Sequence, residues 1–418
     1  MVALLASVAA LLLGVAILNT GNGLFGTFLS LRMTLEAFPT EVTGLIMSAY
    51  YVGLVIGART CHHIINRVGH IRAFSAFAAT VSTVVLVAGF FISPYVWGIM
   101  RAILGFCFAG LFMVVESWLN ARVGTARRGQ LFSLYMMVSY TALGLGQLLL
   151  NLYDPYSRDF FMIAALLYSA SLIPLALTSA VTPTPVATSK LDFSALYRVS
   201  PLGVLACVAS GLVTSSLYGM GAVFAQASGF RVSEVSYFMG AAVTSGLLFQ
   251  YPLGRISDRY DRRHVIVGVA LATALVSLGM AALAGTSKPA LIALACLYGG
   301  FSFTLYPLGV SHANDFLEPR DTVKASGGLL LSWGLGASAG PLAAAALMGR
   351  LGPRGLFVFV AGVTVLLALF ALWRMTRRPS VAPAAKSAFA PPTGMTPVGA
   401  EAGRVAEAEA QAPASAER

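Results

Sequence analysis

The sequence has little charge. Only 10% of its 418 residues are Asp, Glu, Lys or Arg, whereas a soluble globular protein carries about 25%. The 27 basic residues outnumber the 16 acidic ones and give a net charge of +11. They are nevertheless too sparse to form the stripe with which a protein follows nucleic-acid phosphates. This scarcity excludes a cytosolic enzyme, a disordered protein and a nucleic-acid binder. Because 57% of the residues are hydrophobic, lipid is the expected solvent.

Motifs for cofactor chemistry are also missing. The four cysteines form no Cys-x-x-Cys pair, and small apolar core residues are the better interpretation than disulfides or metal ligands. They stand at Cys61, Cys107, Cys207 and Cys296. His62 and His63 cannot share one helix face, and no carboxylate joins them and His70. No glycine-rich phosphate loop with a lysine is present. We therefore expect no metal, no cofactor and no ATP-driven step.

The chain is instead rich in long apolar runs. Twelve runs of about 20 residues or more follow one another, from 2–31 to 354–376, and each is long enough for a membrane helix. The runs are continuous rather than alternating, which excludes a membrane β-barrel. The first run lacks a basic leader, since its first basic residue is Arg32, so we expect it to be a retained helix. The pattern predicts an all-α membrane protein with twelve transmembrane helices.

A polar break separates six runs from six, and short patterns recur across it. Leu24-Phe25-Gly26 recurs as Leu217-Tyr218-Gly219, and four further pairs follow in order at an offset of 192 to 194. Such a period favours two duplicated, pseudo-symmetric halves over chance. After the last run the chain is rich in Pro, Ala and Glu and is expected to be disordered. The predicted units are an N-terminal half 1–181, a central loop 182–199, a C-terminal half 200–376 and a cytoplasmic tail 377–418.

The basic residues also predict the orientation. With both termini in the cytoplasm, the cytoplasmic segments hold 20 Lys and Arg and the outer loops hold 6. Cytoplasmic loops of membrane proteins carry this excess. The net positive charge is therefore a topology signal rather than a binding site for an acidic partner.

Two six-helix halves with a central loop resemble the major facilitator superfamily, whose signature between helices 2 and 3 reads Gly-x-x-x-Asp-Arg-x-Gly-Arg-Arg. Residues 254–263 carry a near-complete copy with Asp258 and Arg259, and residues 62–72 a degraded copy with Asn66 and Arg67. Arg101-x-x-x-Gly105 looks like the superfamily's second motif. Finer features are similar to the bacterial YcaD-like branch, at residues 115–120, 200–203 and 312–316. The resemblance covers about residues 1–376 and implies a secondary transporter. Helix 5 has Gln147 where drug antiporters of the superfamily have Pro, which argues against that route.

Four residues are candidates for gating or coupling. Arg67, Asp258 and Arg259 would latch the cytoplasmic side of the halves, although their charges could also serve topology alone. Glu116 is the one carboxylate within a span. Two interpretations stay open for it: a latch with basic loop residues, or a site for the coupling proton with a pKa raised by burial.

Polar residues inside the spans are candidates for substrate binding, because such residues are costly in lipid. Arg101 suits a bidentate contact with a carboxylate or phosphate, and packing on backbone carbonyls is an equal alternative. Asn19 and Asn22 either hold helices together or line a cavity, and the resemblance, which sets helices 1, 4, 7 and 10 around the pathway, favours the cavity. Ordinary packing with satisfied polar tips competes for the remaining candidates. These are Tyr140, Gln147, Tyr218, Tyr298 and Trp333.

The sequence therefore predicts a secondary transporter, not an enzyme, in the bacterial inner membrane. It would move a small organic solute, anionic or zwitterionic because of Arg101, by alternating access. One alternative is a transporter-like sensor that binds without translocation. Another is a polytopic membrane enzyme, for which His312, Asn314 and Asp315 come nearest to a catalytic group. Expected partners are the solute, membrane lipid and, on one interpretation of Glu116, a proton; a monomer is expected because one chain supplies both halves.

Overall fold

The computed structural model describes residues 2–122, 125–177, 193–317, 319–377 and 389. Within them the chain is helical, with no strand. The first group of helices comprises α1 Val2–Leu35, α2 Thr40–Val68, α3 His70–Phe90, α4 Pro94–Arg122, α5 Thr125–Leu148, α6 Asp159–Ala170 and α7 Leu172–Ala176. The second group comprises α8 Phe193–Val199, α9 Pro201–Ala227, α10 Val232–Arg259, α11 Arg262–Ala282, α12 Lys288–Ser302, α13 Leu305–Asn314, α14 Pro319–Leu351 and α15 Gly355–Met375. The all-α prediction is confirmed.

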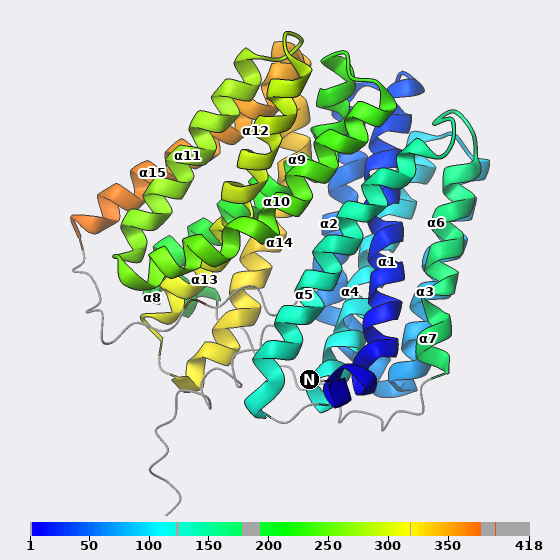
Figure 1. The fold of residues 1–418 in the computed structure, drawn as a ribbon. Helices are drawn as coiled ribbons and strands as arrows, with labels where there is room; N and C mark the ends of the chain where they lie inside the picture. Colours follow the sequence, from blue (N-terminus) through cyan, green and yellow to red (C-terminus); the bar gives the residue numbers. More distant parts are fainter. Residues whose placement is uncertain (1, 123–124, 178–192, 318, 378–388, 390–418) are drawn as a thin grey trace, which may run out of the picture.

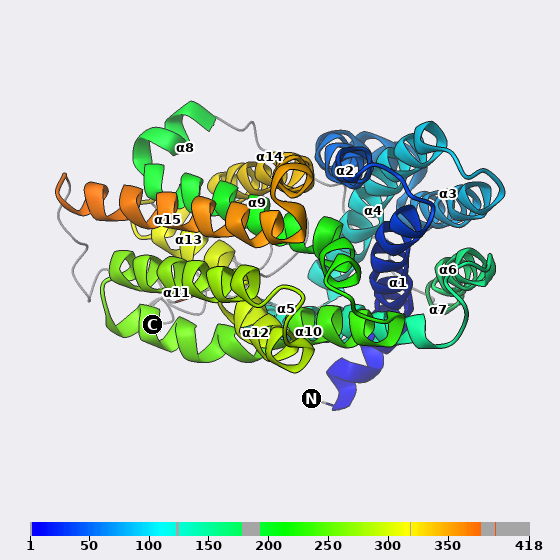
Figure 2. The ribbon, with the colours of Figure 1, turned by 90° about the horizontal axis from the view of Figure 1, so that it is seen from above.

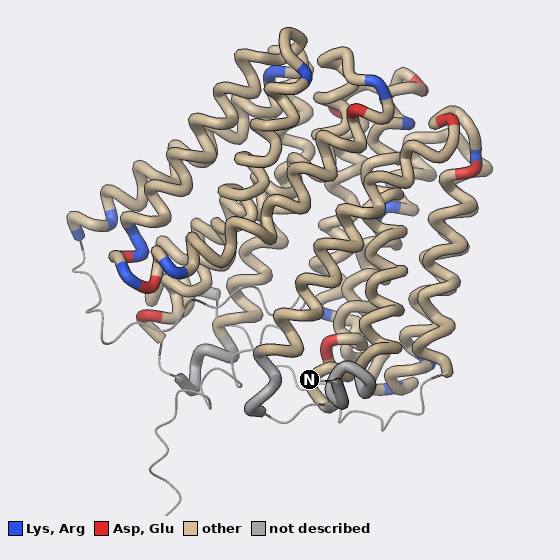
Figure 3. The backbone as a smooth tube through the Cα atoms, in the orientation of Figure 1, with Lys and Arg blue, Asp and Glu red and all other residues tan. Residues whose placement is uncertain are grey.

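The helices account for twelve membrane crossings. Eleven stretches of the described chain are long and apolar enough to span a bilayer. The last of them, Ala325–Met375, holds two helices, α14 and α15, joined by a short 3-10 turn at Gly352–Arg354. Two other crossings are broken: α6 and α7 form one, and α12 and α13 form another. Charged residues lie mostly toward the two ends of the bundle, and few lie between them (Figure 3).

Local sequence signals set several helix ends. Pro201 begins α9, where its missing N–H costs nothing. Asp261 caps α11, since its carboxylate accepts a hydrogen bond of 3.0 Å from the backbone N–H of Arg263. Gly69 joins α2 to α3 with a φ of 87°, a conformation that side chains with a Cβ rarely adopt. The α10–α11 turn is thus built by the same residues that form the sequence motif.

The helices form two groups that lie side by side. Helices α1–α7 make one group and α8–α15 the other, with α5 and α10 adjacent where the groups meet (Figures 1 and 2). The repeated glycines serve equivalent contacts in the two groups. Gly105 of α4 lies on the carbonyl of Tyr50 in α2, and Gly299 of α12 lies on the carbonyl of Ala242 in α10. The two glycines are 194 residues apart, the offset found in the sequence.

The groups touch at one end of the bundle and diverge toward the other. At the end of the α1–α2 connection, the N–H of Leu342 donates to the hydroxyl of Ser48 at 3.1 Å, and Asn151 donates to the hydroxyl of Ser236 at 3.0 Å. At the end where the N-terminus lies, α10, α11 and α15 lean away from α1 and α5 (Figure 1). The molecule is therefore asymmetric along its long axis, closed at the first end and splayed at the second.

Candidate functional site

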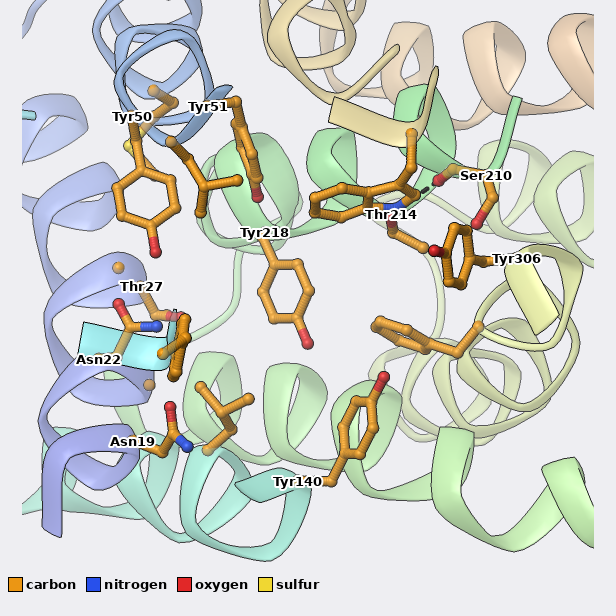
Figure 4. Close-up of a pocket in the computed structure, with 18 of the residues that line it drawn as sticks. Asn19, Asn22, Thr27, Tyr50, Tyr51, Tyr140, Ser210, Thr214, Tyr218 and Tyr306 are labelled. Carbon is orange, nitrogen blue, oxygen red and sulfur yellow. Dashed lines mark hydrogen bonds between the residues drawn. The ribbon is translucent and has the colours of Figure 1, made fainter. Parts of the chain in front are cut away.

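A cavity of about 190 Å³ lies between the two groups of helices. One water molecule needs about 10–15 Å³ of such space, so the cavity has room for a small organic molecule. Seven of the eight residues predicted to bind substrate line it, and Figure 4 labels four of these. The seven are Asn19, Asn22, Arg101, Tyr140, Gln147, Tyr218 and Trp333.

The eighth, Tyr298, is not among the lining residues. Its side chain is fully buried within the second group of helices, and its hydroxyl donates to the carbonyl of Val213 at 3.1 Å. Its ring meets that of Phe357 edge to face, with centroids 5.4 Å apart. Ordinary packing with a satisfied hydroxyl, the alternative left open by the sequence, describes this residue.

Arg101 is the charged residue of the cavity. Its side chain is only 4% exposed, and its guanidinium carbon lies 4.6 Å from the centre of the Tyr50 ring. Its Nε has no hydrogen-bond partner, and no described acidic residue forms an ion pair with it. A buried cation without a counter-charge is costly, and stacking on one phenol offsets about 2 kcal/mol of that cost. The cavity therefore holds a buried positive charge that no described acidic residue balances.

The amide side chains of the cavity also have free hydrogen-bonding atoms. Asn19 is fully buried, and neither its oxygen nor its nitrogen has a partner among the described residues. Gln147 donates to the carbonyl of Gly23 at 3.1 Å, but its side-chain oxygen has no partner. Buried polar atoms are nearly always satisfied, so unsatisfied atoms that face a cavity mark the place of a ligand or water.

Aromatic rings from both groups of helices line the same space. The rings of Tyr51 on α2 and Trp333 on α14 meet edge to face at 6.1 Å, and those of Tyr218 on α9 and Phe303 at 5.7 Å. In Figure 4 the Tyr218 ring lies in the middle of the space, with its hydroxyl toward that of Tyr140. Phe303 stands at the break between α12 and α13, where the helix axis is interrupted.

Several residues that line the cavity were not predicted from the sequence. Six of them carry hydroxyl groups, namely Thr27, Tyr50, Tyr51, Ser210, Thr214 and Tyr306. The available signal was the adjacent pair Tyr50-Tyr51 in the middle of the second run, where tyrosine is unusual because it normally prefers the membrane interface.

Glu116 lies outside the cavity lining. It is fully buried and accepts a hydrogen bond of 3.0 Å from the hydroxyl of Tyr135. The basic residues Arg122, Arg127 and Arg128, which the sequence suggested as its partners, have side chains outside the described part. Glu116 is thus held by a neighbouring helix, away from the space where a solute would sit.

The motif residues of the second half form a charge network at the splayed end. Arg262 contacts Asp258 at 3.1 Å and Asp315 at 3.1 Å, and the backbone N–H of Phe389 donates to Asp258 at 2.8 Å. These contacts stay within the second group and the chain that follows it. Arg67 and Arg259 are exposed.

Asp261 lies in the turn beside this network, outside the spans. Burial raises the pKa of its carboxyl, but the hydrogen bonds and positive charge of Arg263, at 2.7 Å, outweigh burial and bring the pKa below its usual value. Asp261 therefore stays ionised at neutral pH and keeps the α10–α11 turn in place. Asp315, the acidic residue in the group considered for a membrane enzyme, belongs to the same network. Its side chain is 3% exposed and paired with Arg262, which argues against a catalytic role.

The comparisons with known proteins agree on a family. The model of the Major Facilitator Superfamily matches residues 11–303 and 204–408. The uncharacterized MFS-type transporter YcaD of Salmonella typhi is 29% identical over 375 residues, which are 88% of this chain and 96% of the relative. The nucleoside transporter NupG has the same fold, with a TM-score of 0.72 at 17% identity over 88% of this chain and 99% of NupG.

A further solved structure, a bacterial homologue of the human lysosomal transporter Spinster in an inward-facing and occupied conformation, superposes with a TM-score of 0.74. The sequences are 14% identical, and the alignment covers 91% of this chain and 97% of the homologue. These likenesses establish the fold alone. Together with the family match, they identify a multi-pass membrane protein with transporters, not enzymes, as relatives. The chain belongs to the Major Facilitator Superfamily of transporters and resembles YcaD.

Proposed function

We propose that the protein is a secondary transporter that moves a small organic anion or zwitterion across the bacterial inner membrane by alternating access. The observation that carries the proposal is Arg101, a buried guanidinium in a cavity between the two groups of helices that forms no ion pair with any residue of the described chain. A transporter of this architecture binds its solute at such an interface, near the middle of the membrane. The bound anion would supply the missing counter-charge.

The asymmetry of the bundle supports alternating access by rocking of residues 1–181 against 200–376. The hydrogen bonds Leu342 to Ser48 and Asn151 to Ser236 close one end. The distribution of Lys and Arg, 20 against 6, assigns the splayed end to the cytoplasm. Arg67, Asp258 and Arg259 lie at the splayed end, where they would form latch contacts in the opposite conformation. The chain acts as a monomer in membrane lipid, because it contains both halves.

The experiment is a transport assay with the purified protein in liposomes. Metabolites are first compared inside and outside cells with and without the protein, and the solute that differs most is tested for counterflow. Flux should fall at least tenfold in the Arg101→Gln variant, because each 1.4 kcal/mol of lost binding is about tenfold. Arg231→Gln is the matched control, because the Arg231 side chain is 82% exposed and outside the cavity. Binding without flux would instead support a sensor.

A further inference from the structure

The cavity contains groups that distinguish among classes of small anion. This inference rests on the proposed transport function and narrows the solute that the same site takes. Arg101 is the only charged side chain among the described residues that line the cavity. One guanidinium balances one negative charge. A dianion would bring a second charge without a partner, and the ammonium of a zwitterion would find no carboxylate along this lining.

The walls of the cavity favour a flat ring. A row of aromatic contacts leads away from the guanidinium: Arg101 stacks on Tyr50 at 4.6 Å, and the centroids of Tyr50 and Tyr51 are 5.2 Å apart. The row then crosses to the other group of helices, since Tyr51 meets Trp333 at 6.1 Å. Aromatic pairs gain about 0.5–1.5 kcal/mol beyond their buried area when their edges and faces match.

A second wall faces the first. The ring of Phe303 meets Tyr218 at 5.7 Å and Tyr140 at 6.2 Å, both edge to face. Tyr218 and Phe303 belong to the second group of helices and Tyr140 to the first. Figure 4 shows Tyr218 between Tyr51 and Tyr140, with open space to both sides. A planar molecule in this space would touch rings of both halves at once, as a solute must to stabilise a closed intermediate.

The positive charge of Arg101 argues against an organic cation, the ligand that the aromatic walls alone would suggest. Cages of aromatic rings commonly bind organic cations, but a cation here would face Arg101 without a described acid to offset the repulsion. Polar atoms on α1 add recognition of the anionic group instead. The side chain of Asn19 is fully buried with both polar atoms unpartnered, and Asn22, one turn along, lies beside the hydroxyl of Tyr50.

We propose that this cavity binds a planar aromatic monocarboxylate. The carboxylate sits against Arg101 and the amides of α1, and the ring lies between Tyr51 and Trp333 on one side and Tyr218 on the other. Both halves then contribute to one small ligand, the first half through Arg101, the amides of α1 and the ring of Tyr51, and the second half through the rings of Trp333 and Tyr218.

The test is a panel of four matched probes: phenylacetate, cyclohexylacetate, phenylacetamide and phenethylamine. Their binding to the purified full-length protein in lipid nanodiscs is measured by calorimetry. We expect phenylacetate to bind at least tenfold more tightly than phenylacetamide, which lacks the charge, and severalfold more tightly than cyclohexylacetate, which lacks the aromatic face. Phenethylamine should not bind. Equal binding of the amide, the amine or the cyclohexyl probe, or no binding of either carboxylate at millimolar concentration, overturns the proposal.

Variants test separately the recognition of the charge and the recognition of the aromatic ring. Arg101→Gln should remove the preference for phenylacetate over phenylacetamide, and Arg101→Lys, which keeps the charge but not the planar fork, should retain part of it. Tyr51→Leu should remove the preference for phenylacetate over cyclohexylacetate and keep the preference for charge. Arg231→Gln and Tyr237→Leu, both at exposed positions, are the controls and should leave both preferences unchanged.

Transport of the panel distinguishes failure of this inference from failure of the proposed function. If phenylacetate binds but is not transported in counterflow, the proposed ligand class stands and the proposed transport function is contradicted. If a metabolite is transported but neither carboxylate binds, the proposed transport function stands and the proposed ligand class is contradicted.

Discussion

At the scale of single residues, the electrostatics of the site reduce to one unpaired cation. Arg101 is 4% exposed and its Nε lacks a hydrogen-bond partner. The cost of burying a charge is several kcal/mol after relaxation, and the stack on Tyr50 offsets only part of it. The empty protein thus retains a destabilising group whose benefit comes only when a ligand binds. Functional sites commonly trade stability for activity in this way.

Neutralising Arg101 should therefore stabilise the empty protein while it abolishes binding. The Arg101→Gln variant is expected to melt about 1–2 °C higher than the wild type, because about 1 kcal/mol shifts the melting temperature by about 2–4 °C in a protein of 150–250 residues and by less in a chain of 418 residues. The measurement is thermal unfolding of purified protein without solute. A melting temperature several degrees lower would mean that Arg101 is a structural residue, tied to partners that the cavity geometry does not reveal.

A substitution of Glu116 tests whether this buried carboxylate binds the coupling proton. Because it lies outside the cavity and accepts a hydrogen bond from Tyr135, we expect a positioning role at the splayed end. In Glu116→Gln the amide oxygen can still accept this hydrogen bond, so the flux at each pH should remain within about twofold of the wild type, which corresponds to about 0.4 kcal/mol. The assay is solute uptake across a range of external pH. Loss of the pH dependence with normal binding would make Glu116 the coupling residue.

At the scale of helices, closure of one end depends on how closely α2 approaches α14. A Cβ on Gly44 of α2 would collide with Ala345 and with the carbonyl of Pro341 in α14. Pro341 has no N–H to donate within α14, and the N–H of the next residue, Leu342, donates to the hydroxyl of Ser48. The contact is thus specific to this conformation, because its polar part exists only while the two helices touch.

A bulky residue at Gly44 should prevent this closure. We expect Gly44→Leu to retain solute binding but to lose tenfold or more of the counterflow rate, since the closed end must reform in each cycle. Spin labels at the outer ends of α2 and α14 should report a longer distance than in the wild type. Gly362→Leu is the control, because no atom lies within 4 Å of a Cβ there. Unchanged distances and rates in Gly44→Leu would show that closure tolerates a gap.

At the scale of the whole molecule, an unpaired cation also predicts how transport is coupled. The empty cavity must close around Arg101 without a counter-ion to change conformation, whereas the loaded cavity closes around a neutral pair. Exchange of one anion for another should therefore exceed net efflux at least tenfold, which corresponds to about 1.4 kcal/mol of difference between the barriers. The comparison is labelled efflux from liposomes with and without external solute. Equal rates would contradict this coupling.

More of the fold than of the site could be predicted from the sequence. Run length alone predicts twelve crossings, and the 194-residue offset of Gly105 and Gly299 reflects equivalent helix contacts. The rotation of each helix was not predictable, because lipid and protein interior are both apolar and hydropathy does not distinguish them. Tyr298 and Tyr306 share one crossing, yet only Tyr306 lines the cavity. The break at Phe303 contributes to that difference; Pro307 follows it in α13 and cannot donate a hydrogen bond back to the carbonyl of Phe303.

The contact between Phe389 and Asp258 has a practical consequence for purification. The backbone of Phe389 donates to a carboxylate of the superfamily motif, and its ring covers Gly254. A chain shortened to its last helix, at Met375, would lose this cover and leave Asp258 with one hydrogen bond fewer. Truncation would therefore alter a motif for which we propose a role in gating. Affinity tags belong after Arg418, and kinetic work belongs on the full-length chain.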